Sequence, residues 1–137
     1  MALAVIVTLE KEIPASAVYA KAKTGKAVAR ELEKLDFAAR CKGVTQPSSL
    51  LSENPSALIE QLKADGFDPS KMRIPPEQFH PAAEGLKVIR ALHDYVSEKL
   101  NDFKQPNPIL RDLKAADALL AAADAAGVKF HLTKTQL

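Results

Sequence analysis

Three side chains that can bind metals or transfer protons lie close together in the stretch PPEQFHPAAE, residues 75–84. Glu77, His80 and Glu84 are separated by three and four residues, the spacing that places side chains on one face of a helix. Carboxylates and imidazoles on facing helices bind the metals of di-metal bundles, and the same groups act as general acids and bases. This chemistry requires that one continuous helix carries all three residues.

Pro81 argues against a continuous helix. The residue before a proline is disfavoured in the α region, so His80 is expected to be extended. Pro81 then suits the first helical position, with His80 as the N-cap. Glu77 belongs to the approach to this helix, and Glu84 lies in its first turn, where a negative charge complements the helix dipole. We therefore predict a helix start, and Glu77, His80, Glu84 and the more distant His93 remain candidate site residues for an alternative function.

The other residues that could do chemistry are isolated in the sequence. His93 lies beside an apolar helical stripe and is expected to be half-buried, and His131 is expected to face solvent from the polar face of a strand. Cys41 is the only cysteine, which excludes an internal disulfide and fits a reducing compartment. It is expected near a helix C-terminus, where the dipole disfavours a thiolate. We predict no catalytic residue, no metal ligand and no cofactor.

The densest basic run consists of Lys21, Lys23, Lys26 and Arg30. A weak nucleic-acid contact through this run is one alternative function. The formal net charge of +2 is too small to imply a nucleic-acid or membrane partner by itself. Thr24, Gly25 and Lys26 resemble part of a phosphate loop, but such a loop needs a second glycine and a hydroxyl residue where this chain has Ala20 and Ala27. We reject the phosphate loop.

The composition predicts one mainly helical domain spanning residues 1–137. Hydrophobic residues make up 47% of the chain but aromatic residues only 5%, and there are 23 alanines. Alanine has the highest helix propensity, so helices are expected to dominate. The first residues, MALAVIVTLEKE, contain an apolar run too short to span a membrane and lack the basic leader of a signal peptide. We expect a cytoplasmic protein.

Hydrophobic periodicity predicts the elements that would position these side chains. Alternating apolar residues indicate strands at 2–10 and 128–133. Three-and-four spacing indicates three long helices at 25–42, 81–102 and 107–127, and a shorter one that Asn54 caps and Gly66 ends. Because two strands alone are marginal, a third is needed, from Ala17–Ala22 or from dimerisation through an edge. The predicted fold is α+β, with these helices packed on a small sheet built from both termini.

Three stretches carry a resemblance to a known group of proteins. They are GKAVARELEKLD at 25–36, FHPAAEGLKVIRAL at 79–92 and LLAAADAAGVKFHL at 119–132. Together they resemble an uncharacterised family of small bacterial α+β proteins. The resemblance implies no activity and therefore no role for any residue.

The sequence favours a non-catalytic, cytoplasmic protein-interaction or binding domain, with a homodimer left open. This preference rests on the missing pairing of nucleophile with base, metal cluster and phosphate loop. The alternative is a small metal- or ligand-binding protein, or a hydrolase, that uses Glu77, His80, Glu84 and His93.

Overall fold

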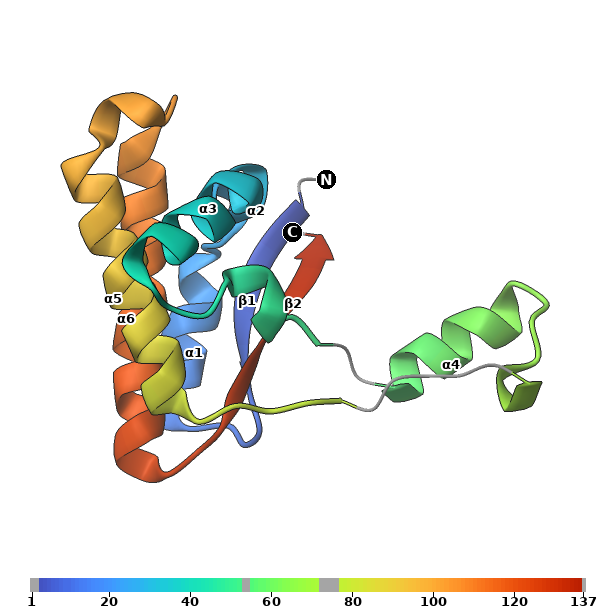
Figure 1. Ribbon diagram of the computed structural model, residues 1–137. Coiled ribbons are helices and arrows are strands. Elements are labelled where there is room, and N and C mark those ends of the chain that lie inside the picture. The colour runs from blue at the N-terminus through green and yellow to red at the C-terminus, as the bar shows by residue number, and fades with distance from the viewer. Residues whose placement is uncertain (1–2, 53–54, 72–76, 137) are drawn as a thin grey trace.

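A computed structural model describes residues 3–52, 55–71 and 77–136. The chain is 64% helical, with a two-stranded antiparallel sheet, so the predicted mainly helical α+β class is confirmed. The elements in chain order are β1 (Leu3–Leu9), α1 (Pro14–Ala22), α2 (Lys26–Arg30), α3 (Leu32–Lys42), η1 (Pro47–Leu50), α4 (Pro55–Ala64), η2 (Pro69–Lys71), α5 (Ala82–Glu98), η3 (Leu100–Asp102), α6 (Pro106–Ala126) and β2 (Phe130–Gln136). Figure 1 shows the helices α1, α2, α3, α5 and α6 gathered on one side of the sheet, with α4 standing apart from the rest.

The two terminal strands pair with each other, as predicted. β1 and β2 are antiparallel from the pair Leu3 and Gln136 to the pair Leu9 and Phe130. In this register Val7 lies opposite Leu132, and both side chains are buried. The alternation of the two strands therefore places one apolar face of the sheet in the core.

Both edges of the sheet are occupied by other parts of the chain. On the β1 edge, Val5 N–H donates to Gly25 O at 3.0 Å, and Val7 N–H donates to the Tyr19 hydroxyl at 3.0 Å. On the β2 edge, residue 51 forms a parallel bridge to Leu132, and His80 forms an antiparallel bridge to Phe130. These contacts satisfy edge groups that would otherwise be open to pairing with another chain.

The candidate third strand at Ala17–Ala22 is wrong, because these residues belong to helix α1. Pro14 occupies the first turn, where its missing N–H is not needed, and the Ser16 hydroxyl accepts a hydrogen bond from Ile13 N–H at 3.1 Å. The alanines at positions 15, 17, 20 and 22, together with Lys21, favour a helix despite the strand-forming residues Val18 and Tyr19. In the described part of the chain, no third strand pairs with the sheet, and two isolated bridges, from Leu51 and His80 to β2, take its place.

The core lies between the sheet and the long helices α5 and α6, which pack against each other along most of their length (Figure 1). Phe130 is fully buried and its ring points at Gly85 of α5. A side chain at Gly85 would place its Cβ 2.6 Å from Phe130 Cε1, well inside van der Waals contact. The glycine therefore allows the helix to approach the ring closely.

Several helix boundaries differ from the sequence prediction. The helix expected at 25–42 divides at Glu31, whose backbone leaves the helical region with φ of −111° and ψ of 22°. α5 begins at Ala82 with Pro81 as the N-cap, so the prediction of His80 as the cap is wrong by one residue. α6 begins at Pro106, before the expected Asn107. Asn54, the expected cap of the short helix, lies outside the described residues, as do Pro75 and Pro76.

Candidate functional site

The four candidate side chains occupy separate places along the chain. Glu77 and His80 lie in the extended approach to α5, Glu84 lies in its first turn, and His93 lies farther along the same helix. Because the helix begins only at Ala82, Glu77 and Glu84 do not share one helix, as predicted from Pro81. The spacing that suggested a ligand set therefore does not bring the three side chains to one helical face.

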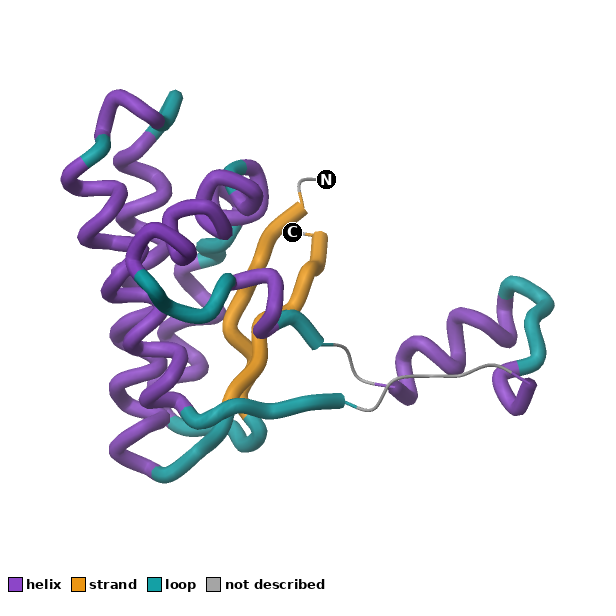
Figure 2. Tube along the Cα trace, in the orientation of Figure 1, coloured by secondary structure: helices purple, strands orange, loops and turns teal. Residues whose placement is uncertain are grey.

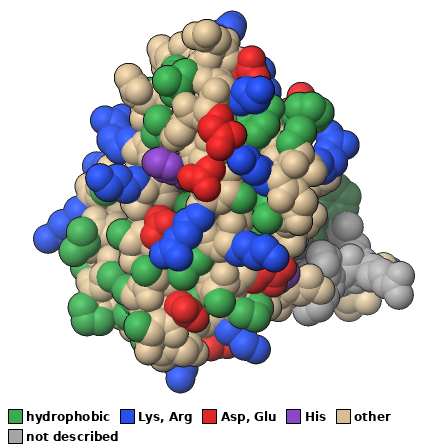
Figure 3. Space-filling view, turned by 60° about the vertical axis from the view of Figure 1, so that its left-hand side comes forward, with side chains coloured by type: hydrophobic (Ala, Val, Ile, Leu, Met, Phe, Trp, Pro, Cys, Tyr) green, Lys and Arg blue, Asp and Glu red, His purple; other side chains and the backbone are tan. Residues whose placement is uncertain are grey.

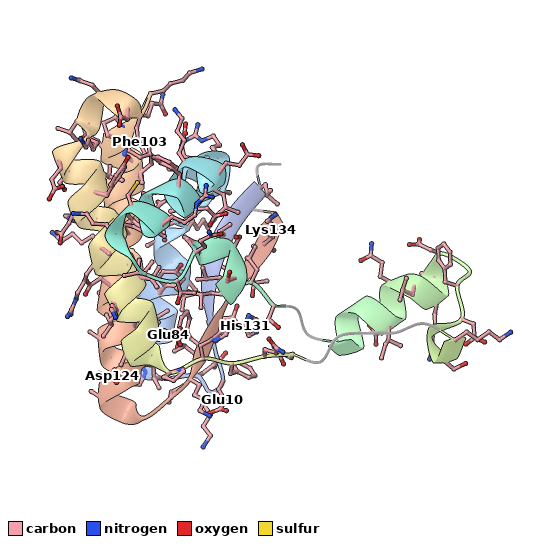
Figure 4. The ribbon with its side chains drawn as sticks, in the orientation of Figure 1. Glu10, Glu84, Phe103, Asp124, His131 and Lys134 are labelled. Atoms are coloured by element: carbon pink, nitrogen blue, oxygen red, sulfur yellow. The ribbon has the colours of Figure 1, made fainter. Side chains whose placement is uncertain are left out.

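His80, Glu84 and His93 each have different neighbours. Glu84 Oε1 accepts a hydrogen bond from the Thr45 hydroxyl at 3.2 Å. The backbone of His80 pairs with Phe130, donating from N–H at 2.7 Å and accepting at O from Phe130 N–H at 2.9 Å. His93 is partly exposed and lines a shallow hollow together with Arg90 and Asp117. These two residues form an ion pair, with 3.0 Å between Arg90 Nε and Asp117 Oδ2. Figure 4 shows Glu84 near the N-terminal end of α5.

Glu77 instead contacts His131, a residue that the sequence placed in solvent. His131 is only 1% exposed, so that expectation is wrong. Its Nε2 lies 2.7 Å from Glu77 Oε2, and the Phe79 ring covers it with the two ring centroids 4.9 Å apart. The extended stretch before α5 runs across β2 here and buries the imidazole (Figure 4). Burial of a polar ring is tolerated because both of its nitrogens have partners.

A chain of hydrogen bonds continues from His131 across the sheet. Its Nδ1 lies 3.2 Å from the Thr133 hydroxyl and 3.1 Å from Leu132 O. The Thr133 hydroxyl lies 2.8 Å from the Thr8 hydroxyl on β1. When Nε2–H donates to the Glu77 carboxylate in the neutral imidazole, Nδ1 accepts from the Thr133 hydroxyl and does not donate to Leu132 O, and the Thr133 oxygen accepts from Thr8.

This order of carboxylate, imidazole and hydroxyl is also that of a nucleophilic triad. Its surroundings favour a structural role. The imidazole is almost fully buried, and both ring nitrogens are already engaged within the chain. The Thr133 hydroxyl, which would be the nucleophile, is itself paired with the Thr8 hydroxyl. We interpret the Glu77–His131 pair as a clamp that fixes the stretch at 77–80 on β2.

The basic run does not form an open anion site at the start of α2. Lys21, Lys23, Lys26 and Arg30 are exposed, as a solvated surface would be. The first amides of α2, Ala27 N–H and Val28 N–H, donate to Asp112 Oδ2 at 3.0 and 3.4 Å. Asp112 is buried on α6 and supplies the negative charge that a helix N-terminus favours. The chain's own carboxylate therefore occupies the position where a phosphate would bind.

The surface shows charges of both signs on the face formed by the long helices. In Figure 3, basic and acidic side chains are interspersed over this face. One ion pair between the two long helices joins Arg90 of α5 to Asp117 of α6, whose Nε and Oδ2 atoms lie 3.0 Å apart. Exposed pairs of this kind contribute little stability, but they break up any continuous positive field on this face.

Within the described residues, no group of three or more His, Cys, Asp or Glu side chains is placed to hold a metal ion. None of the described helices is both long and apolar enough to cross a membrane. Cys41 is exposed on α3 rather than buried.

Residues 55–71 are here called the arm. The described residues that precede and follow it in the sequence, up to Ser52 and from Glu77 on, lie side by side next to β2. We call residues 3–52 and 77–136 the body. Before the arm, Ser52 N–H donates to Leu132 O at 2.9 Å; after it, Gln78 N–H donates to the Ser52 hydroxyl at 2.9 Å. Figure 2 shows the arm projecting away from the body, and its helix α4 packs mainly against its own turn η2.

Comparison of the chain with protein-family models, curated proteins and solved structures gives no match. The resemblance to an uncharacterised bacterial family therefore stays a prediction.

Proposed function

We propose that this protein is a non-catalytic binding protein that engages a protein partner through the arm. The observation that carries the proposal is the narrow neck below the arm, where Gln78 N–H lies 2.9 Å from the Ser52 hydroxyl. The Gln78 to Ser52 hydrogen bond and the bridges of Leu51 and His80 to β2 hold the two body segments that flank residues 53–76 side by side. Among the residues whose burial is described, the core of the body and the contacts that cover part of each sheet edge include none from the arm, so these contacts do not explain why the arm is present.

The arm carries apolar side chains of the kind that helix-recognition surfaces use. Ile59 and Leu62 are partly exposed on α4, and Phe67 is 56% exposed just beyond its end. Phe67 N–H donates to Leu62 O at 2.9 Å, and Gly66 has φ of 86°, which together form the αL ending typical of helices. This ending fixes the direction of Phe67 relative to the helix. Such an apolar helical end suits a partner that offers an apolar groove.

A matched pair of variants tests the role of Phe67. Phe37 on α3 is 53% exposed, nearly the same as Phe67, but it belongs to the body. We expect Phe67→Ala to weaken capture of a specific protein partner by about 10- to 30-fold, the effect of losing one central apolar anchor. Phe37→Ala should leave capture unchanged, and both variants should keep the stability of the parent protein.

A second experiment removes the arm completely. Residues 53–76 are replaced by about four Gly and Ser residues, which can span the short neck between Ser52 and Glu77. We expect a folded body that no longer captures the partner, and light scattering shows whether that partner is a second copy of the chain. Capture that survives the excision, or reproducible turnover of a small substrate by the purified protein, would contradict the proposal.

A further inference from the structure

A groove between α1 and β1 is lined by residues other than those of the arm and the Glu77–His131 clamp, although its lining residue Thr8 belongs to the hydrogen-bond chain that starts at His131. It has a volume of about 340 Å³, at the lower end of the range for small-molecule sites. Its lining includes Ile6 and Thr8 of β1, Tyr19 and Ala20 of α1, Thr24, Leu119 of α6, and the charged residues Glu12 and Lys23. Most of this lining is apolar, with a few polar groups placed along it, as is usual in such sites.

One polar group in this lining has no partner. Thr24 is only 9% exposed, and its Oγ1 lies near the Tyr19 hydroxyl, but among the described residues it makes no hydrogen bond of good geometry. A buried hydroxyl without a partner is unfavourable by roughly 1–3 kcal/mol, so such groups are rare and need a reason. A ligand that supplies the missing partner is one such reason.

The neighbours of Thr24 decide which partner is missing. The Tyr19 oxygen already accepts from Val7 N–H at 3.0 Å. Burial raises the pKa of Tyr19, while Val7 N–H and the nearby Thr24 hydroxyl lower it, so the phenol keeps its proton at neutral pH. The two hydroxyls thus hold two protons, and Val7 N–H is already donated to Tyr19. The group still lacking is an acceptor.

The charges that line the groove limit the ligand further. The lining holds one acid and one base, Glu12 and Lys23. Their opposite charges give an ionic ligand of either sign no net attraction. A neutral carbonyl oxygen accepts a hydrogen bond without needing a net charge in the lining.

Helix α1 is able to admit a ligand because it is held loosely. It has no fully buried residue, and its Val18 is 71% exposed. Its main contact is with α6. It is linked to β1 by the hydrogen bond that Val7 N–H donates to the Tyr19 hydroxyl. A helix with so few buried apolar contacts opens at a lower free energy than the core elements.

We infer that the groove between α1 and β1 binds a small, neutral, mostly apolar molecule through one carbonyl oxygen that accepts a hydrogen bond from the Thr24 hydroxyl. This goes beyond the proposed function, because the groove is in the body and does not involve the arm. Its failure and the failure of the arm proposal are therefore separable.

The test uses a medium-chain ketone, octan-2-one, as the probe and octanoate as its anionic counterpart. Binding to the full-length protein is followed by the amide chemical shifts of labelled protein. We expect saturable shifts centred on Val7, Tyr19 and Thr24, with a dissociation constant on the order of millimolar for a molecule of this size. Octanoate should bind more weakly than the ketone.

Variants of the groove show whether the hydroxyl makes the contact. Thr24→Val keeps the shape and removes the donor, so it should weaken ketone binding by about 3- to 10-fold. Ala20→Trp changes an exposed residue at the groove and should abolish binding in a folded protein. Thr135→Val, a matched change on β2 outside the groove lining, should have no effect. Ketone shifts that do not saturate, that centre elsewhere, or that are the same in Thr24→Val would overturn the inference.

Discussion

The contact between Gly85 and Phe130 provides the sharpest test of the packing. An alanine Cβ at position 85 would lie 2.6 Å from Phe130 Cε1 and closer still to Cζ. Carbon atoms pack best at about 3.5–4.0 Å, so the ring would have to move by about 1 Å. Phe130 is fully buried and its backbone is bonded to His80 on one side and paired with Leu9 on the other. The ring therefore has little room to move.

Two effects oppose each other in Gly85→Ala. Replacing glycine by alanine inside a helix is favourable by about 1 kcal/mol, because the unfolded chain has less freedom to lose. Overpacking a well-filled core is unfavourable by about 1–3 kcal/mol, and the fixed backbone of Phe130 places this case at the upper end. We expect a net loss of about 1–2 kcal/mol in the free energy of unfolding, measured by urea denaturation with far-UV circular dichroism.

A double-mutant cycle separates these two effects. In a Phe130→Leu background the ring is gone, and Gly85→Ala should become neutral or stabilising, with a coupling of about 1–3 kcal/mol. Ala83→Gly, at an exposed position of the same helix, measures the helix-propensity effect alone. If Gly85→Ala stabilised the parent protein, or lost the same amount in both backgrounds, the close approach of helix and ring would be refuted.

Three further predictions follow from the hydrogen bonds and the pKa shift. Asp112→Ala should lower stability by about 1–3 kcal/mol because Ala27 N–H loses its acceptor, whereas Asp112→Asn, which keeps an oxygen, should lose less in the same urea assay. Glu77→Ala should lower stability by about 1–2 kcal/mol and release the stretch over His131, seen as faster amide exchange at 77–80. At alkaline pH, the unfolded state should lose the Tyr19 proton before the folded state does, because burial raises the folded pKa. Stability should therefore fall as the pH rises above about 10, and Tyr19→Phe should reduce this fall in denaturation curves recorded at several pH values.

The features that the sequence predicted well are those that depend on neighbouring residues. Gly43 and Gly127 end helices in the αL conformation, as expected for glycine after an apolar helical face. Alternation in the two terminal segments identified both strands, and their pairing followed because no other alternating segment was as strong. Pro81 correctly separated Glu77 from the helix that carries Glu84.

The features that the sequence did not reveal depend on residues far apart. The Glu77 to His131 contact joins residues 54 positions apart, and the Ala27 to Asp112 contact joins residues 85 apart. Alternation correctly placed His131 on the side of β2 opposite to Phe130, but it could not show that residues 77–80 cover that side. From the sequence, Asp112 on its helix is interpreted as a solvated charge, because the sequence does not show that the start of α2 lies beside it.

The arm raises a different question, because its presence has to be reconciled with the stability of the body. Closing a long excursion at a narrow neck is entropically unfavourable, and the arm returns few contacts with the body to offset this. A shorter connection between Ser52 and Glu77 would satisfy the same bridges to β2. If the arm contributed to folding, its excision would lower the free energy of unfolding. The neck geometry predicts the opposite, a body at least as stable as the parent protein, and that result would support the proposal that the arm serves to bind a partner.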